Sequence, residues 1–151
     1  MQTRTRALAA LAAALIAAPG LTACGGGDDS SAAASTIENF FHSMGGKDAE
    51  GACKASTTTD GKQPLESDDK TFQECVKALT MAFGSAKKNE LDQLKNVTVK
   101  EAKVDGDTAT VSPDAVEGLP GSVDISGGEP VKLVKIDGHW YIKAGASAFG
   151  G

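Results

Sequence analysis

The chain has 151 residues, of which 40% are hydrophobic and 23% charged, and its formal net charge is −5. This length suits one folded domain. An acidic chain without clustered lysine and arginine excludes nucleic-acid binding, because neutralising phosphates requires such clusters. The local basic doublet Lys87-Lys88 supplies too few charges, and we expect it on a solvated surface.

Residues 1–23 have the pattern of an export signal. Arg4 and Arg6 precede an apolar run from Ala7 to Ala18, and Pro19-Gly20 breaks that run. A positive start, a short apolar stretch and small residues at the end are typical of signal peptides. The run is too short and too rich in alanine to span a membrane stably. We therefore expect residues 1–23 to be removed from the mature protein.

The segment Leu21-Thr22-Ala23-Cys24 resembles the lipobox of bacterial lipoproteins. In those proteins the cysteine receives a diacylglyceryl group, and a peptidase then cuts before it. Two acyl chains anchor a protein stably, whereas one gives only marginal binding. The resemblance therefore implies an exported protein with lipidated Cys24, anchored to the outer face of the bacterial cytoplasmic membrane.

A flexible tether is expected at residues 24–35. The stretch from Gly25 to Ala34, GGGDDSSAAA, has no apolar residue larger than alanine. Such a segment cannot bury enough surface to offset the entropy of ordering it. We expect it to hold the domain away from the bilayer.

Three helices are predicted after the tether. Ser35 to Glu38 matches a capping box that starts the first helix, and Gly45-Gly46 ends it. Asp48 is suited to cap a short second helix. Ser67-Asp68-Asp69 precedes the third helix, which Gly84 ends. Apolar residues recur at helical spacing in the first helix (Ile37, Phe40, Phe41, Met44) and in the third (Phe72, Cys75, Val76, Leu79, Phe83).

With Cys24 set aside for lipid, Cys53 and Cys75 remain as a pair. An exported protein meets an oxidising environment, which favours a disulfide between the second and third helices. A redox or metal-binding pair is the alternative, but neither a CxxC spacing nor a nearby histidine supports it.

From Asn96 onward the apolar period changes from helical to alternating, which predicts an antiparallel sheet. Asp105-Gly106-Asp107 marks a hairpin turn that places Val104 opposite Ala109. Apolar residues before Lys100-Glu101 are out of phase with those after it, which predicts a β-bulge there.

A second hairpin is centred on Asp137-Gly138, a pair suited to a type I′ turn. This turn pairs Lys135 with Trp140 and Leu133 with Ile142. The opposite sheet face then carries three apolar side chains, Val134, Ile136 and Tyr141, as a possible interface. Three covers for this face remain open: a homodimer contact, the segment 113–130 folding over it, or a partner protein.

Helices followed by an antiparallel sheet make the chain α+β. Gly46 to Ala49 is similar to the junction between the first helices of NTF2-like domains, and the hairpins at 104–111 and 137–142 look like the sheet of that superfamily. Together with the lipobox and the cysteine pair, the chain resembles small actinobacterial-type lipoproteins with NTF2-like, DUF4878-like domains. The resemblance covers about residues 36–145. It implies a cone in which three N-terminal helices pack on a curved antiparallel sheet, and residues 146–151 are expected as a frayed tail.

The resemblance also implies a pocket within the cone. Its expected lining is Phe41, Phe72, Leu133, Trp140 and Ile142. Catalytic members of the superfamily place an aspartate or a His–Asp pair in this cone, whereas the inward face expected here has no titratable group. We expect neither a cofactor nor a metal, since Asp105-Gly106-Asp107 lacks the spaced ligands of a calcium loop.

Three functional hypotheses follow. The first is a non-catalytic binding module for a small hydrophobic ligand or a protein partner. The second is an enzyme of the isomerase or hydrolase type, which would use His139, Asp105 or Asp107 and requires one of them to point into the cone. The third is a structural or interaction domain with a filled core. His42 lies outside the apolar stripe of its helix and is expected on the surface.

Overall fold

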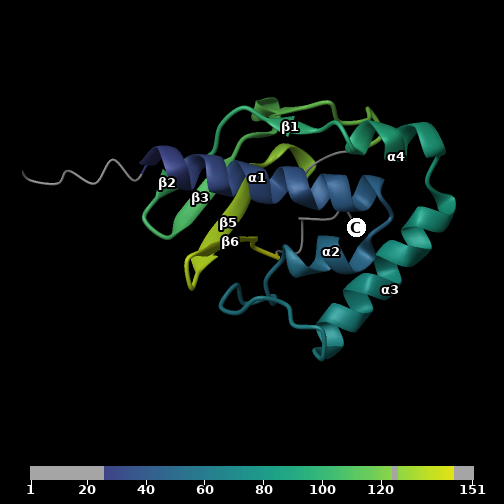
Figure 1. The fold of residues 1–151 in the computed structure, drawn as a ribbon, viewed down its shortest axis with the longest axis horizontal. Helices are drawn as coiled ribbons and strands as arrows, with labels where there is room; N and C mark the ends of the chain where they lie inside the picture. The colour runs from purple at the N-terminus through teal and green to yellow at the C-terminus, as the bar shows by residue number, and fades with distance from the viewer. Residues whose placement is uncertain (1–25, 124–125, 145–151) are drawn as a thin grey trace, which may run out of the picture.

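The computed structural model describes residues 26–123 and 126–144, so residues 1–23, the proposed lipidation site Cys24 and the tail at 146–151 lie outside it. The described part is α+β with antiparallel sheets, as predicted (Figure 1). The helices are α1 (Gly26–Gly45), α2 (Ala49–Lys54), α3 (Lys70–Ser85) and α4 (Lys88–Leu94). The strands are β1 (Thr98–Val99), β2 (Lys103–Asp105), β3 (Thr108–Val111), β4 (Val116–Glu117), β5 (Val131–Ile136) and β6 (His139–Ile142), with 3-10 turns at Pro113–Ala115 and Ser126–Gly128.

Helix α1 begins at Gly26, so the predicted flexible tether is wrong for residues 26–35, and Ser35 lies inside the helix rather than at its cap. Alanine has the highest helix propensity, and acidic residues in the first turn, here Asp28 and Asp29, favour a helix start. Ala33 is completely buried, because its small side chain lets the helix lie close to its neighbours. Cys24 and Gly25, the first two residues of the predicted tether, lie outside the described residues.

Helices α2 and α3 form the predicted disulfide-linked pair. The backbone amide of Gly51 donates to Asp48 Oδ1 at 2.9 Å, which confirms Asp48 as the cap of α2. Cys53 and Cys75 are joined, with their Cα atoms 6.1 Å apart. In the entropic model, closing a loop of this size stabilises the fold by about 3 kcal/mol.

The main sheet has the order β2-β3-β5-β6, with every neighbouring pair antiparallel. The predicted pairings are confirmed: Val104 with Ala109, Lys135 with Trp140 and Leu133 with Ile142. Asp137 and Gly138 have φ of 49° and 82°, the two positive values that a type I′ turn requires.

The predicted bulge at Lys100-Glu101 is wrong. Strand β1 pairs with β4 in a separate two-stranded sheet, and the chain then crosses through residues 100–102 to enter β2 of the main sheet. The apolar phase changes there because the chain changes partners, not because one strand carries an extra residue.

The core lies between α1 and the main sheet. Ile37, Phe40 and Phe41 of α1 pack in one buried cluster with Leu133 and Trp140 of the sheet. A smaller cluster of Cys53, Leu65 and Phe72 lies between α2 and α3. In the described part of the chain, no helix is long and apolar enough to cross a membrane.

Two glycines at helix ends offer a matched stability test. A Cβ on Gly45 would lie 2.6 Å from the carbonyl oxygen of Leu91 and 2.8 Å from the amide nitrogen of Lys95. Both atoms are backbone, so we expect Gly45→Ala to lower the free energy of unfolding by about 1–3 kcal/mol. A Cβ on Gly84 meets nothing within 4 Å, so Gly84→Ala should raise that free energy by up to about 1 kcal/mol. Urea unfolding of both variants is the measurement, and equal effects would contradict the close packing of α1 on α4.

Candidate functional site

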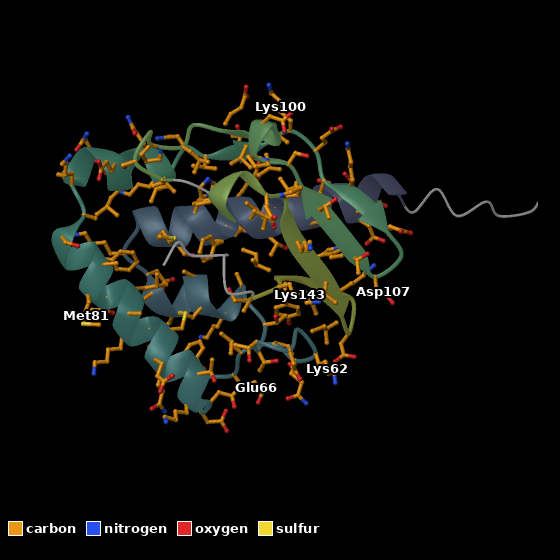
Figure 2. The ribbon with its side chains drawn as sticks, turned by 180° about the vertical axis from the view of Figure 1, so that it is seen from behind. Lys62, Glu66, Met81, Lys100, Asp107 and Lys143 are labelled. Carbon is orange, nitrogen blue, oxygen red and sulfur yellow. A yellow bond between two sulfur atoms is a disulfide. The ribbon has the colours of Figure 1, made fainter. Side chains whose placement is uncertain are left out.

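A groove runs between α1 and the connection from β1 to β2. Its volume is about 440 Å³, and it is open to solvent. Its lining residues come from α1 (Ser30, Ser31, Ala34, Ser35, Glu38) and from the connection (Val99, Lys100, Glu101). Figure 2 shows Lys100 projecting from this connection.

Hydrogen bonds tie the two walls of the groove together near both ends. The amide of Val99 donates to Glu38 Oε1 at 2.8 Å, and the Ser30 hydroxyl donates to the carbonyl of Ala102 at 2.7 Å. These contacts join residues 61 and 72 positions apart in the sequence. The groove is therefore held by the tertiary fold and not by one loop.

The groove is polar. Serine hydroxyls both donate and accept hydrogen bonds, and the carboxylates of Glu38 and Glu101 accept them. Lys100 forms a 2.7 Å ion pair with Glu117, and hydrogen bonding to that carboxylate raises the pKa of the Lys100 amine. Such walls suit an occupant with polar groups of its own, such as a peptide segment or a small polar molecule.

An ion pair fixes the first turns of α1, which carry one end of the groove. Lys135 Nζ lies 2.6 Å from Asp29 Oδ1 and 5.7 Å from the centre of the Trp140 ring. The hydrogen bond from Lys135 lowers the pKa of the Asp29 carboxyl below its usual 3.8, and partial desolvation opposes this shift. The indole Nε1 itself is buried and makes no hydrogen bond.

The five side chains expected to line a pocket fall into two groups. Phe41, Leu133, Trp140 and Ile142 belong to the central cluster, where each is at most 6% exposed. Phe72 lies in the separate cluster under α3. The structure therefore uses these side chains to fill its cores, and the groove described above is lined by other residues.

The face that carries Val134, Ile136 and Tyr141 is half-buried. Val134 and Tyr141 are directly opposite one another in the sheet, and Ile136 pairs with the exposed His139. All three apolar side chains point away from the cluster that holds Leu133 and Trp140. A homodimer contact, the segment 113–130 and a partner protein were the three expected covers of this face. Which of them covers it stays a prediction.

The candidate catalytic side chains lie on the outside. His139, Asp105 and Asp107 are exposed at strand ends and a hairpin turn, and Asp107 projects at one end of the molecule (Figure 2). His42 is exposed, as expected, with Nε2 3.0 Å from the carbonyl oxygen of Val97. Among residues 26–123 and 126–144, no three His, Cys, Asp or Glu side chains are grouped to hold a metal ion.

Sequence reasoning missed the groove because it assigned Ser30, Ser31 and Ala34 to a tether. The serines at positions 31 and 35 are one helical turn apart, which is the signal that could have placed them on one face. The opposite wall, residues 99–101, has no local pattern that distinguishes it from an ordinary connection.

Comparison with known proteins gives one family. The family described as "Domain of unknown function (DUF4878)" matches residues 22–143. No curated protein matches the chain.

We expect Asp29→Asn to loosen the first turns of α1. A carboxyl whose pKa is lowered by folding contributes stability above its unfolded pKa of 3.8, and that contribution disappears as the pH falls through the folded pKa. The variant should therefore be less stable than the wild type at neutral pH, and the difference should vanish in acid. Hydrogen exchange of the amides at 28–34 and acid unfolding curves are the measurements.

Asp28→Asn is the matched control, because it changes the neighbouring exposed aspartate outside the ion pair. Equal effects of the two variants at every pH would show that the Asp29–Lys135 pair does not hold the helix start.

Proposed function

We propose that this chain, which belongs to the DUF4878 family, is a lipoprotein of the bacterial cell envelope whose folded domain acts by binding and not by catalysis. Cys24 would carry the lipid and hold the domain on the outer face of the cytoplasmic membrane. The groove between α1 and residues 99–101 would receive the bound molecule.

Two sequence features support the anchor. The apolar run with its two arginines ends in Leu21-Thr22-Ala23-Cys24, the pattern of a lipobox. An extracytoplasmic location is also the setting in which the Cys53–Cys75 disulfide would persist.

The arrangement of elements supports an NTF2-like relation. Helix α1 covers one face of an antiparallel sheet, with the short α2 beside it, and the two tight hairpins have the predicted registers (Figure 1). The small β1–β4 sheet and the fourth helix are additions to the three-helix cone that the resemblance implied.

The polar groove is the observation that carries the binding function. A small hydrophobic ligand was expected inside the cone, but Phe41, Leu133, Trp140 and Ile142 are covered by one another and by α1. We therefore favour a polar occupant, either a small molecule or a polar segment of a partner protein. The enzyme alternative requires His139, Asp105 or Asp107 to face inward, and their exposed positions weigh against it.

Substitution of Cys24 tests the anchor. Produced in a bacterial host with its full leader, the wild-type chain should begin at Cys24, carry at least two acyl chains and fractionate with membranes. Cys24→Ser should abolish both the acyl mass and the cut before position 24, because the peptidase acts after the cysteine has been lipidated. Intact-mass measurement and membrane flotation are the readouts, and an unacylated wild-type chain would refute the anchor.

Filling the groove tests the binding function. Ser31 is exposed and lines the groove, so Ser31→Trp should occupy it with little cost to the core. Native mass spectrometry of the chain purified from host membranes should show an added mass that denaturation removes. We expect Ser31→Trp to reduce this occupancy at least about tenfold, equivalent to about 1.4 kcal/mol.

Ala78→Trp is the control, because it adds the same bulk to an exposed position of α3. This control should keep the wild-type occupancy. Added mass that persists in Ser31→Trp would place the occupant elsewhere, and an apo mass for all three chains would contradict the binding of a small molecule in the groove.

A further inference from the structure

We propose that the end of the domain formed by the first turn of α1 and the turns of the two hairpins lies against the lipid headgroups, while α3 points away from the membrane. The partner of this surface is thus a lipid bilayer. The inference rests on the proposed lipidation of Cys24 and adds an orientation to it.

The length of chain between anchor and domain is the first step. Cys24 is two positions before Gly26, where α1 begins. Each residue spans at most about 3.6 Å, so the helix starts within roughly 7 Å of the lipidated residue. A separation this short leaves no room for the domain to stand away from the bilayer.

The second step is that the start of α1 is fixed to the rest of the domain. Asp29 is paired with Lys135 of β5 at 2.6 Å, the Ser30 hydroxyl donates to the Ala102 carbonyl at 2.7 Å, and Ala33 is fully buried. These contacts begin three residues into the helix. The anchor therefore constrains the orientation of the whole domain and not only of a loose N-terminal arm.

The third step is what lies at each end of α1. The start of α1 is at the same end of the molecule as the β2–β3 turn with Asp107, and α3 with Met81 is at the opposite end (Figures 1 and 2). The β5–β6 turn, residues 137–138, lies at the same end of the sheet as the β2–β3 turn. Strand β3 begins after the β2–β3 turn and pairs antiparallel with β5, so the start of β3 lies beside the end of β5.

The chemistry of this end excludes insertion into the bilayer. Asp28, Asp105, Asp107 and Asp137 are all exposed there. Met81 is the large hydrophobic residue that is strongly exposed in the described part of the chain, with 64% of its surface accessible. It lies on α3, at the opposite end of the molecule. Acidic side chains do not enter a bilayer, so the covalent lipid, and not burial of this surface, would hold it at the headgroups.

Site-specific fluorescence quenching tests the orientation. The acylated full chain, with its disulfide intact, is reconstituted in vesicles of phosphatidylethanolamine and phosphatidylglycerol that contain a nitroxide-labelled phosphatidylcholine. Asp107→Cys and Met81→Cys each supply one free thiol for a fluorophore. We expect the probe at position 107 to be quenched several-fold more than the probe at position 81.

A second pair of cysteine variants tests the orientation again, so that the test does not depend on the folding of one variant. Thr108→Cys lies beside the near turn, and Lys77→Cys lies on α3, both at exposed positions. Equal quenching within both pairs, or stronger quenching on α3, would overturn the orientation. Intact mass separates the two proposals: acylated Cys24 with equal quenching overturns the orientation alone, whereas an unmodified Cys24 overturns the anchor and the orientation together.

Discussion

The packing of α1 across the main sheet is the constraint on which the rest of this structure depends. Helix α1 contacts α2, α4, β1, β2, β3 and β6, so it joins two of the other helices to both sheets. Ile37, Phe40 and Phe41 are each at most 5% exposed, and full burial of such side chains contributes about 1.5–3 kcal/mol apiece. At Gly45 the helix approaches α4 so closely that a side chain would meet backbone. The large side chains of α1 thus stabilise the domain by their burial, and its small residues permit close approach to the neighbouring elements.

Sequence reasoning found the parts of this fold that have a local physical signal. The two turns were predictable because Asp137 and Gly138 accept the two positive φ values of their turn and Gly106 accepts a positive φ in the other, and the strand registers followed from these turns. The stripe at Ile37 and Phe40 was predictable from its period. The start of α1 was not, because Ala33 stabilises the helix by fitting closely against its neighbours, which hydrophobicity does not reveal. The change in the apolar alternation at Lys100 was visible in the sequence. Such a change does not show which strand pairs with the segment that follows it.

The candidate groove could not be predicted for a related reason. Its walls are Ser30 to Glu38 on one side and residues 99–101 on the other, and only the tertiary fold brings them together. The apolar alternation of the sequence predicted large side chains on the inward face, where the resemblance to NTF2-like domains implied a pocket. Here the same side chains fill the core between helix and sheet. An apolar inward face therefore predicts burial reliably, but it does not distinguish a pocket from a packed core.

The first turns of α1 connect the proposed anchor to the proposed binding site. Apart from Ala33 and Ala34, these turns are held by polar contacts, the Asp29–Lys135 pair and the Ser30–Ala102 hydrogen bond. Polar contacts at a partly exposed surface contribute modestly, so a bound molecule can add to the stability of these turns. A molecule that binds Ser30 and Ser31 in the groove binds only the folded form of these turns and must stabilise them by mass action. Occupancy of the groove and folding of the first turns of α1 are therefore thermodynamically linked. An occupied groove keeps these turns helical and so holds the domain close to Cys24. If the turns unfolded, residues 25–34 would become the flexible tether that their composition suggests.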